Sequence, residues 1–183
     1  MIIIVSGLTG SGKTTLAKRL AEYFKFEYVS GSSLLRKVLP LHFDVWESKE
    51  GLSAIALRMK ELKYDMKVDN YIKKYVSRKS DLVLDSWTAA YYIRRENTIK
   101  IRLQANEEER AKRISIRDKI GYKDALKQIH EKDAKTAKIY TKLYGFDVIN
   151  DLSKFDLILS TDRIDEDATF DICKRFIEAY NKK

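Results

Sequence analysis

The chain has 183 residues, of which 44% are hydrophobic and 34% are charged, and its net charge is +9. This length predicts one domain with a substantial core, and no apolar run is long enough to span a bilayer, which excludes an integral membrane protein. Cys173 is the only cysteine, so no internal disulfide can form, and no basic leader precedes the first apolar run. Both features point to a cytoplasmic protein.

The excess of basic residues is spread along the chain. Lys and Arg alternate with Asp and Glu in the predicted helices, and no five basic residues are consecutive. This pattern indicates a solvated surface together with a cleft that handles phosphate, and it makes a nucleic-acid-binding surface the weaker alternative.

The first predicted elements are a short apolar strand over Ile2–Ser6 and an amphipathic helix over Thr15–Phe24. Between them, residues 7–14 match the phosphate-binding loop G-x-x-x-x-G-K-[ST] at each fixed position. Glycines let backbone N–H groups surround an anion, Lys13 reaches the outer phosphates, and the Thr14 hydroxyl ligates Mg²⁺. The predicted ATP-binding residues of this segment are Gly7, Leu8, Thr9, Gly10, Ser11, Gly12, Lys13, Thr14 and Thr15.

A serine-rich turn that opens a helix follows the second predicted strand, Glu27–Ser30. Such a turn can bind the phosphate of an acceptor, with Ser33 beside it and Arg36 as a bidentate clamp. An ordinary helix cap followed by a surface arginine explains the pattern equally well. Residues 31–80 are mostly helical and exceed a simple crossover, so we expect them to form an acceptor-binding insertion.

A carboxylate ends the third predicted strand, Leu82–Asp85, beside the phosphate loop. Asp85 is expected to orient Mg²⁺, usually through water, and the alternative is a cap or turn aspartate. Because Ser86 follows it, the Asp-Glu pair of motor-type ATPases is missing. The chain also lacks the Asn-Lys-x-Asp motif of regulatory GTPases.

The strand Thr98–Leu103 leads into a helix, Asn106–Asp118, on which Arg110, Arg113 and Arg117 share one face. This stripe is either a solvated surface or a source of positive charge for a phosphoryl group in transfer. Residues 118–147 contain a helix over Tyr122–Leu143 and are expected to form a lid. His42 and His130 are isolated and lack metal-ligand spacing.

Five short strands, the last over Leu157–Ser160, alternate with helices along the chain. This alternation predicts an α/β fold in which helices flank both faces of a five-stranded parallel sheet. We expect a single P-loop domain with its core over 1–30, 81–117 and 148–183. The helical insertion 31–80 and the lid with its following helix, 118–147, complete it.

The chain resembles the nucleoside monophosphate kinases, and most closely the archaeal cytidylate kinases, over nearly its whole length. The segments that carry the resemblance are Gly7–Thr15, Ser30–Arg36, Tyr64–Asp69, Leu82–Asp85, Arg110–Ile114, Tyr144–Asp147 and Phe155–Thr161. The resemblance implies a P-loop kinase fold and transfer of the γ-phosphoryl group of ATP, with Mg²⁺, to a nucleoside monophosphate. CMP or dCMP is the acceptor that it implies. A monomer without a membrane partner is expected.

The resemblance also implies roles at matching positions. Lys13, Arg113 and Arg117 are the implied catalytic residues, the last two as lid arginines. Arg110 and Asp162 are implied ATP contacts, the latter near the adenine. The implied acceptor contacts are Ser33, Arg36, Asp65, Asp69 and Trp87.

The acceptor half departs from the family pattern. The family's third strand ends Glu-Gly-Arg, and that arginine also binds the acceptor phosphate, whereas this chain reads Asp85-Ser86-Trp87. Further expected arginines are replaced by Asn70, Tyr71, His130, Lys132 and Ile139. A kinase with a different acceptor therefore stays open, with Trp87 stacking on a ring or closing the pocket. So does a nucleotide-binding or nucleic-acid-associated protein without transferase activity.

Overall fold

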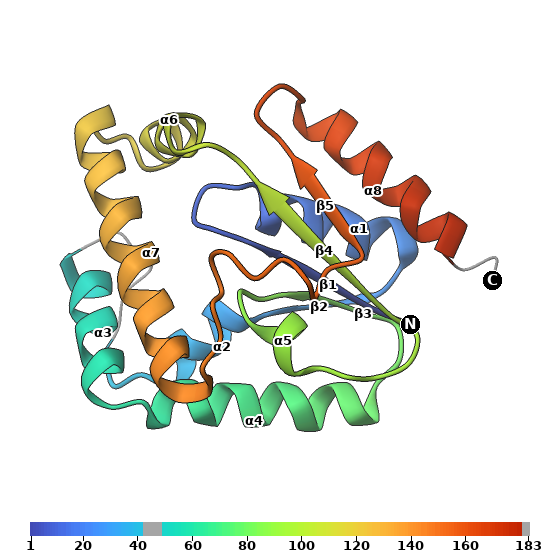
Figure 1. Ribbon diagram of the computed structural model, residues 1–183, viewed down its shortest axis with the longest axis horizontal. Coiled ribbons are helices and arrows are strands. Elements are labelled where there is room, and N and C mark those ends of the chain that lie inside the picture. Colours follow the sequence, from blue (N-terminus) through green and yellow to red (C-terminus); the bar gives the residue numbers. More distant parts are fainter. Residues whose placement is uncertain (42–48, 181–183) are drawn as a thin grey trace.

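A central parallel sheet with helices on both faces organises the molecule, as the computed structural model of residues 1–41 and 49–180 shows (Figure 1). Its strands are β1 (Ile2–Gly7), β2 (Glu27–Ser30), β3 (Leu82–Asp85), β4 (Thr98–Gln104) and β5 (Leu157–Ser160). They lie in the order β2-β3-β1-β4-β5, and all neighbours are parallel. The predicted α/β class and all five strands are confirmed, with β1 and β4 one residue longer than expected.

The register of the strands brings polar residues at the strand ends, including the predicted Mg²⁺ contact Asp85, to one edge of the sheet. Val5 of β1 and Ser30 of β2 both pair with Asp85 of β3, and Ser6 pairs with Arg102 of β4. Since the strands are parallel, their carboxyl ends meet at this edge, where ligands bind in open α/β sheets. The loop after β1 therefore lies directly beside Asp85.

Eight helices are seen in the described part of the chain. They are α1 (Lys13–Phe24), α2 (Gly31–Val38), α3 (Lys49–Lys60), α4 (Lys63–Arg78), α5 (Ala89–Tyr92), α6 (Glu107–Asp118), α7 (Tyr122–Tyr144) and α8 (Glu166–Tyr180). None of them is both long and apolar enough to cross a membrane.

Two apolar cores cover the two faces of the sheet. On one face, Ile3 and Val5 pack against Leu16 of α1 and Ile177 of α8. On the other face, Ile2 and Ile4 belong to a second cluster, which also includes Leu35 of α2, Ile55 of α3 and Ile72 of α4. Alternate residues of β1 thus serve opposite cores, which is why the strand reads as a continuous apolar run.

The two predicted insertions contain the helices that cover the carboxyl edge. Residues 31–80 include α2, α3 and α4, and His42 lies outside the described residues. The predicted lid is largely one helix, α7, which packs against both α6 and α3 (Figure 1). Gly145 ends α7 with a positive φ of 71°, a backbone conformation that glycine adopts without steric cost.

Candidate active site

The glycine loop between β1 and α1 depends on backbone conformations that favour glycine and, at Gly10, on the absence of a side chain. Gly10 has a φ of 80°, and a Cβ there would lie 2.9 Å from the carbonyl oxygen of Arg110. Gly12 caps α1 with a φ of 89°. The loop therefore turns tightly onto α6 before α1 begins at Lys13, which directs the positive end of that helix at the loop.

Thr14 and Asp85 meet at the foot of the loop. The Thr14 hydroxyl donates to Asp85 Oδ2 at 2.6 Å, and the Tyr28 hydroxyl donates to the same oxygen at 3.2 Å. Burial, reinforced by the Asp85 charge, raises the pKa of the Tyr28 hydroxyl, so it remains a donor. No cluster of three His, Cys, Asp or Glu side chains that could hold a metal occurs in the described residues. One hydroxyl and one carboxylate fit a Mg²⁺ ion that takes its other ligands from phosphates and water.

A cavity of about 490 Å³ opens above the loop, and we call it the phosphate cleft. Five basic side chains line it, whereas Asp118 is its one acidic lining residue in the described part of the chain. The basic residues are Lys13, Lys18, Arg36, Arg117 and Lys132. Such an excess of positive charge suits a ligand with several phosphates.

Two predicted arginines of the cleft are held by neighbours on their own helices. Arg36 Nη2 donates to Ser33 Oγ at 3.2 Å, which keeps the expected pair together on α2. Arg117 forms a bidentate contact with Asp118, with distances of 2.6 and 2.7 Å. Both guanidinium groups thus lie at the cleft wall.

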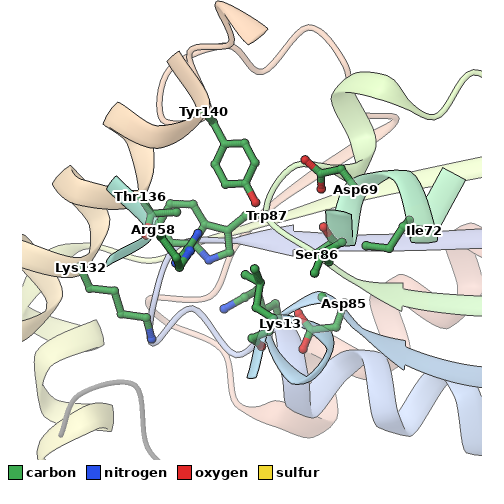
Figure 2. Close-up of a pocket in the computed structure, with 14 residues that line it drawn as sticks. Lys13, Arg58, Asp69, Ile72, Asp85, Ser86, Trp87, Lys132, Thr136 and Tyr140 are labelled. Carbon is green, nitrogen blue, oxygen red and sulfur yellow. The ribbon is translucent and has the colours of Figure 1, made fainter. Parts of the chain in front are cut away.

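A smaller cavity of about 80 Å³, the inner pocket, adjoins the phosphate cleft (Figure 2). Lys13 and Lys132 line both cavities, so these two ammonium groups mark the boundary between them. Deeper in the inner pocket, Trp87, Tyr140 and Asp69 surround the space. The pocket therefore combines aromatic walls with the Asp69 carboxylate at its inner end and two ammonium groups at its mouth, and Arg58 and Asp85 also line it.

Asp69 offers a buried carboxylate to this environment. Its Oδ1 accepts a hydrogen bond from the Tyr92 hydroxyl at 3.0 Å, and the Tyr144 hydroxyl is a further donor to this carboxylate. Burial raises the pKa of Asp69 to about 6, an effect that the hydrogen bonds from the Tyr92 and Tyr144 hydroxyls oppose. A buried acceptor of this kind favours a ligand that donates a hydrogen bond.

Asp65 is paired with an arginine that the sequence did not single out. Arg58 of α3 donates from Nε and Nη2 to the two Asp65 oxygens at 3.1 and 2.7 Å. The exposed fractions are 4% for Arg58 and 0% for Asp65. Arg58 lines the inner pocket and Asp65 is absent from its wall, so the predicted acidic contact lies behind an arginine. No sequence motif indicates this role of Arg58. Its partner lies on another helix, and the packing of the two helices decides the pairing.

The other departures from the family pattern have distinct surroundings. Trp87 is half-buried beside Tyr140, and Ile139 is buried in the same apolar cluster. Lys132 reaches the boundary between the two cavities. His130 is exposed and contacts Glu107. Of the replaced arginine positions on α7, Lys132 therefore supplies the cation of the site.

A groove on the other side of the loop contains Arg113. It is lined by Gly12, Thr15, Arg19, Arg113, Thr161 and Asp165, with further residues of α1 and the start of α8. Arg113 donates to the Thr161 hydroxyl at 2.9 Å and to the Thr161 carbonyl at 2.6 Å. The structure thus separates the two expected lid arginines, with Arg117 at the phosphate cleft and Arg113 at this groove.

Two of the expected ATP contacts hold protein backbone. Asp162 accepts from the Asn106 N–H at 2.7 Å and from the Ser160 hydroxyl at 3.1 Å, and it is absent from the groove lining. Arg110 is buried, and its Nη1 donates to the Thr9 carbonyl at 3.0 Å. Both residues shape the segments around the loop.

Sequence comparison with known proteins points to a single family. The model of the cytidylate kinase-like family matches residues 2–163. A cytidylate kinase from Saccharolobus islandicus (strain L.S.2.15) is 37% identical over 168 residues, covering 90% of this chain and 84% of the relative. One from Sulfurisphaera tokodaii is 33% identical over 183 residues, covering 98% and 94%.

The fold has counterparts among solved structures. A shikimate kinase from Bacteroides thetaiotaomicron superposes with a TM-score of 0.61 at 13% identity, covering 97% of this chain and 98% of that structure. At this identity the likeness bears on architecture alone. It confirms the expected P-loop kinase fold.

Proposed function

Because the chain belongs to the cytidylate kinase-like family, we propose that it transfers the γ-phosphoryl group of ATP to a nucleoside monophosphate, with CMP and dCMP as preferred acceptors. The observation that carries this proposal is the junction of two cavities at Lys13 and Lys132. A donor on the glycine loop and an acceptor in the inner pocket would bring their phosphates together there. Family membership and this arrangement disfavour a protein that only binds nucleotides.

On the donor side, the glycine loop would hold the phosphates, and the groove containing Arg113 and Thr161 would receive the adenine. Thr14 and Asp85 would hold Mg²⁺, which neutralises phosphate charge when bound. Lys13 would contact the transferred group from α1. In this assignment Arg113 would contact the adenine of the donor, and Arg117 would be the arginine that approaches the transferred phosphoryl group.

On the acceptor side, the base would enter the inner pocket, and its phosphate would remain near Arg36 and Lys132. Trp87 and Tyr140 offer aromatic faces to a planar ring, and Asp69 offers a hydrogen-bond acceptor. Catalysis would then consist of positioning and charge stabilisation, without a covalent enzyme intermediate.

The insertion 31–80 would hold the acceptor, and residues 118–147 would close the site from above. Closure excludes water, which suppresses hydrolysis of ATP. A monomer in the cytoplasm completes the proposal, consistent with a lone, buried Cys173.

The direct test is a screen of all ribonucleoside and deoxyribonucleoside monophosphates with ATP and Mg²⁺, following ADP formation. We expect the highest kcat/KM with CMP or dCMP. A higher value with another phosphate-bearing acceptor would replace the cytidylate assignment within the same fold. Salt-dependent RNA binding without any ADP formation would contradict transferase activity altogether.

The Asp85→Asn variant is expected to lower kcat at least about tenfold and to raise the Mg²⁺ concentration needed for half-maximal rate. The change preserves the shape beside Thr14 and removes the charge that orients the ion. Initial rates over a Mg²⁺ titration measure both effects. Asp171→Asn, which removes an exposed carboxylate on α8, is the matched control. An unchanged Mg²⁺ dependence would reduce Asp85 to a turn residue.

The preference for CMP over UMP is expected to fall as the pH decreases through about 6. Burial raises the pKa of Asp69 to about 6, so its carboxyl is mostly ionised at pH 7.5 and mostly protonated at pH 5. The ionised form accepts a hydrogen bond from the cytosine amino group, whereas uracil offers an oxygen at that position. We expect about a tenfold or greater loss of discrimination, as for one charge-assisted hydrogen bond.

This titration is measured as the kcat/KM ratio of CMP to UMP from pH 5 to 8, which reports groups of the free enzyme. Asp69→Asn is expected to give a lower ratio that does not change with pH. A ratio that is constant in the unmodified protein, or a titration that survives in Asp69→Asn, would exclude Asp69 as the discriminating group.

A further inference from the structure

A buried contact joins the tip of the glycine loop to the helix that lines the acceptor side. The Thr9 N–H donates to Asp133 Oδ1 at 3.4 Å, and the Thr9 carbonyl accepts from Arg110 Nη1 at 3.0 Å. Arg110 Nη1 also donates to Asp133 Oδ2 at 2.5 Å. All three residues are buried. Both backbone groups of one loop residue are therefore held by a single ion pair between α6 and α7.

Asp133 occupies a special position on α7. Its neighbour Lys132 lines both the phosphate cleft and the inner pocket, and Thr136 and Tyr140 line the inner pocket one and two turns further on. A displacement of α7 relative to the loop would therefore move the cation that lies between the two cavities. The ion pair between Arg110 and Asp133 limits such a displacement, because both side chains are buried and their hydrogen bonds are directional.

The charge around Asp133 indicates why a carboxylate is needed there. Arg102 of β4 is 1% exposed, donates to Ser6 Oγ at 3.2 Å, and has no hydrogen-bond partner for Nε among the described residues. Burial lowers the pKa of Arg102, an effect that the charge of Asp133 opposes and that of Arg110 reinforces. Asp133 thus lies between two buried guanidinium groups beneath the loop, and an apolar or neutral residue there would leave both without a counter-charge.

We propose that Asp133 is a positioning residue that couples the donor loop to α7, so that ATP on the loop fixes Lys132 in place for the acceptor phosphate. The proposal rests on the proposed function for the identity of the acceptor. It does not depend on that identity for the coupling between loop and helix. Thr9 and Arg110 are the two groups through which Asp133 acts.

The coupling has a consequence that can be measured without any acceptor. Phosphates on the loop reduce the movement of Thr9, which in turn limits the movement of Asp133 and the middle of α7. A non-hydrolysable ATP analogue with Mg²⁺ should therefore slow hydrogen exchange of the α7 amides over residues 129–137 in the full-length protein. In Asp133→Asn, the analogue should protect the loop and leave α7 unchanged.

The consequence for the acceptor is a change in binding cooperativity. In the unmodified protein, the ATP analogue should tighten CMP binding at least about fivefold, within the range of ordinary coupling between sites. Asp133→Asn should reduce this factor to less than about twofold and lower kcat more than it raises KM for CMP. Glu131→Gln is the matched control. Glu131 is on the same helix, and its carboxylate accepts a hydrogen bond from Lys135 at 3.0 Å and makes no contact with Thr9.

The two readouts keep the alternatives distinct. Nucleotide protection of α7 that is absent in the unmodified protein, or that persists in Asp133→Asn, would overturn the coupling. Protection that depends on Asp133 while CMP fails to bind would uphold the coupling and contradict the acceptor assignment.

A second variant tests the proposal if Asp133→Asn does not fold. It removes both charges of the ion pair, so no uncompensated charge remains from the pair. The pair Arg110→Met with Asp133→Leu replaces the buried ion pair by apolar side chains, a change that proteins often tolerate. It removes both contacts to Thr9, so the same loss of α7 protection and of cooperativity is expected. Retention of either property in this folded variant would overturn the proposal.

Discussion

The Lys13→Ala variant is expected to lower kcat about a hundred- to a thousandfold while its melting temperature stays within a few degrees of that of the unmodified protein. Lys13 begins α1 and lines both cavities. It would therefore stay beside the phosphoryl group throughout its transfer from donor to acceptor. Removing one preorganised positive group from such a place typically costs a hundred- to a thousandfold in rate. Lys13 is not part of either core that packs on the sheet, which is why stability should change little.

The measurement combines steady-state kinetics at saturating ATP and acceptor with thermal unfolding followed by circular dichroism. Lys74→Ala is the control, since Lys74 is an exposed lysine on α4 that lines none of the three cavities described. A Lys13→Ala enzyme that turns over at nearly the normal rate would contradict the assignment of the loop as the donor site. A large fall in melting temperature would show that Lys13 has a structural role instead.

The second large effect is expected at the acceptor phosphate. Arg36→Ala should lower kcat/KM for CMP by about 2–3 kcal/mol, or about 30- to 150-fold, as expected for the loss of a charge-assisted contact. Arg36 lines the phosphate cleft with Ser33, and Trp87 stands where the family pattern has another arginine for this phosphate. The remaining cation on α7, Lys132, is a point charge and cannot reproduce a bidentate arginine contact.

Binding of ATP should hardly change in Arg36→Ala, because Arg36 is absent from the groove around Arg113 and Thr161 that is proposed to receive the adenine. Titrations with ATP and with CMP, each alone, separate the two sites. Lys37→Ala removes the neighbouring exposed charge and serves as the control, and Arg36→Lys tests the need for two parallel hydrogen bonds. Efficient CMP turnover in Arg36→Ala would leave the fold intact and contradict the proposed position of the acceptor phosphate.

Much of the fold could be predicted because its signals are local. Most strands are short runs rich in aliphatic and β-branched residues, and the strand ends were predicted to within one residue. The loop Gly7–Thr14 follows from fixed backbone requirements, since Gly10 and Gly12 need positive φ and Gly10 has no space for a Cβ. Parallel pairing then places Asp85 beside Thr14, where their side chains are 2.6 Å apart.

The tertiary structure alone decided which partner each side chain meets. Helical periodicity puts Arg110, Arg113 and Arg117 on one face of α6, yet Arg110 contacts the loop backbone, Arg113 contacts Thr161 and Arg117 lines the phosphate cleft. Periodicity fixes the angle of a side chain around its helix axis, whereas its partner depends on which segment packs at that height. For the same reason no pattern revealed that Arg58 pairs with Asp65, or that Asp133 holds Thr9 across 124 positions of the chain.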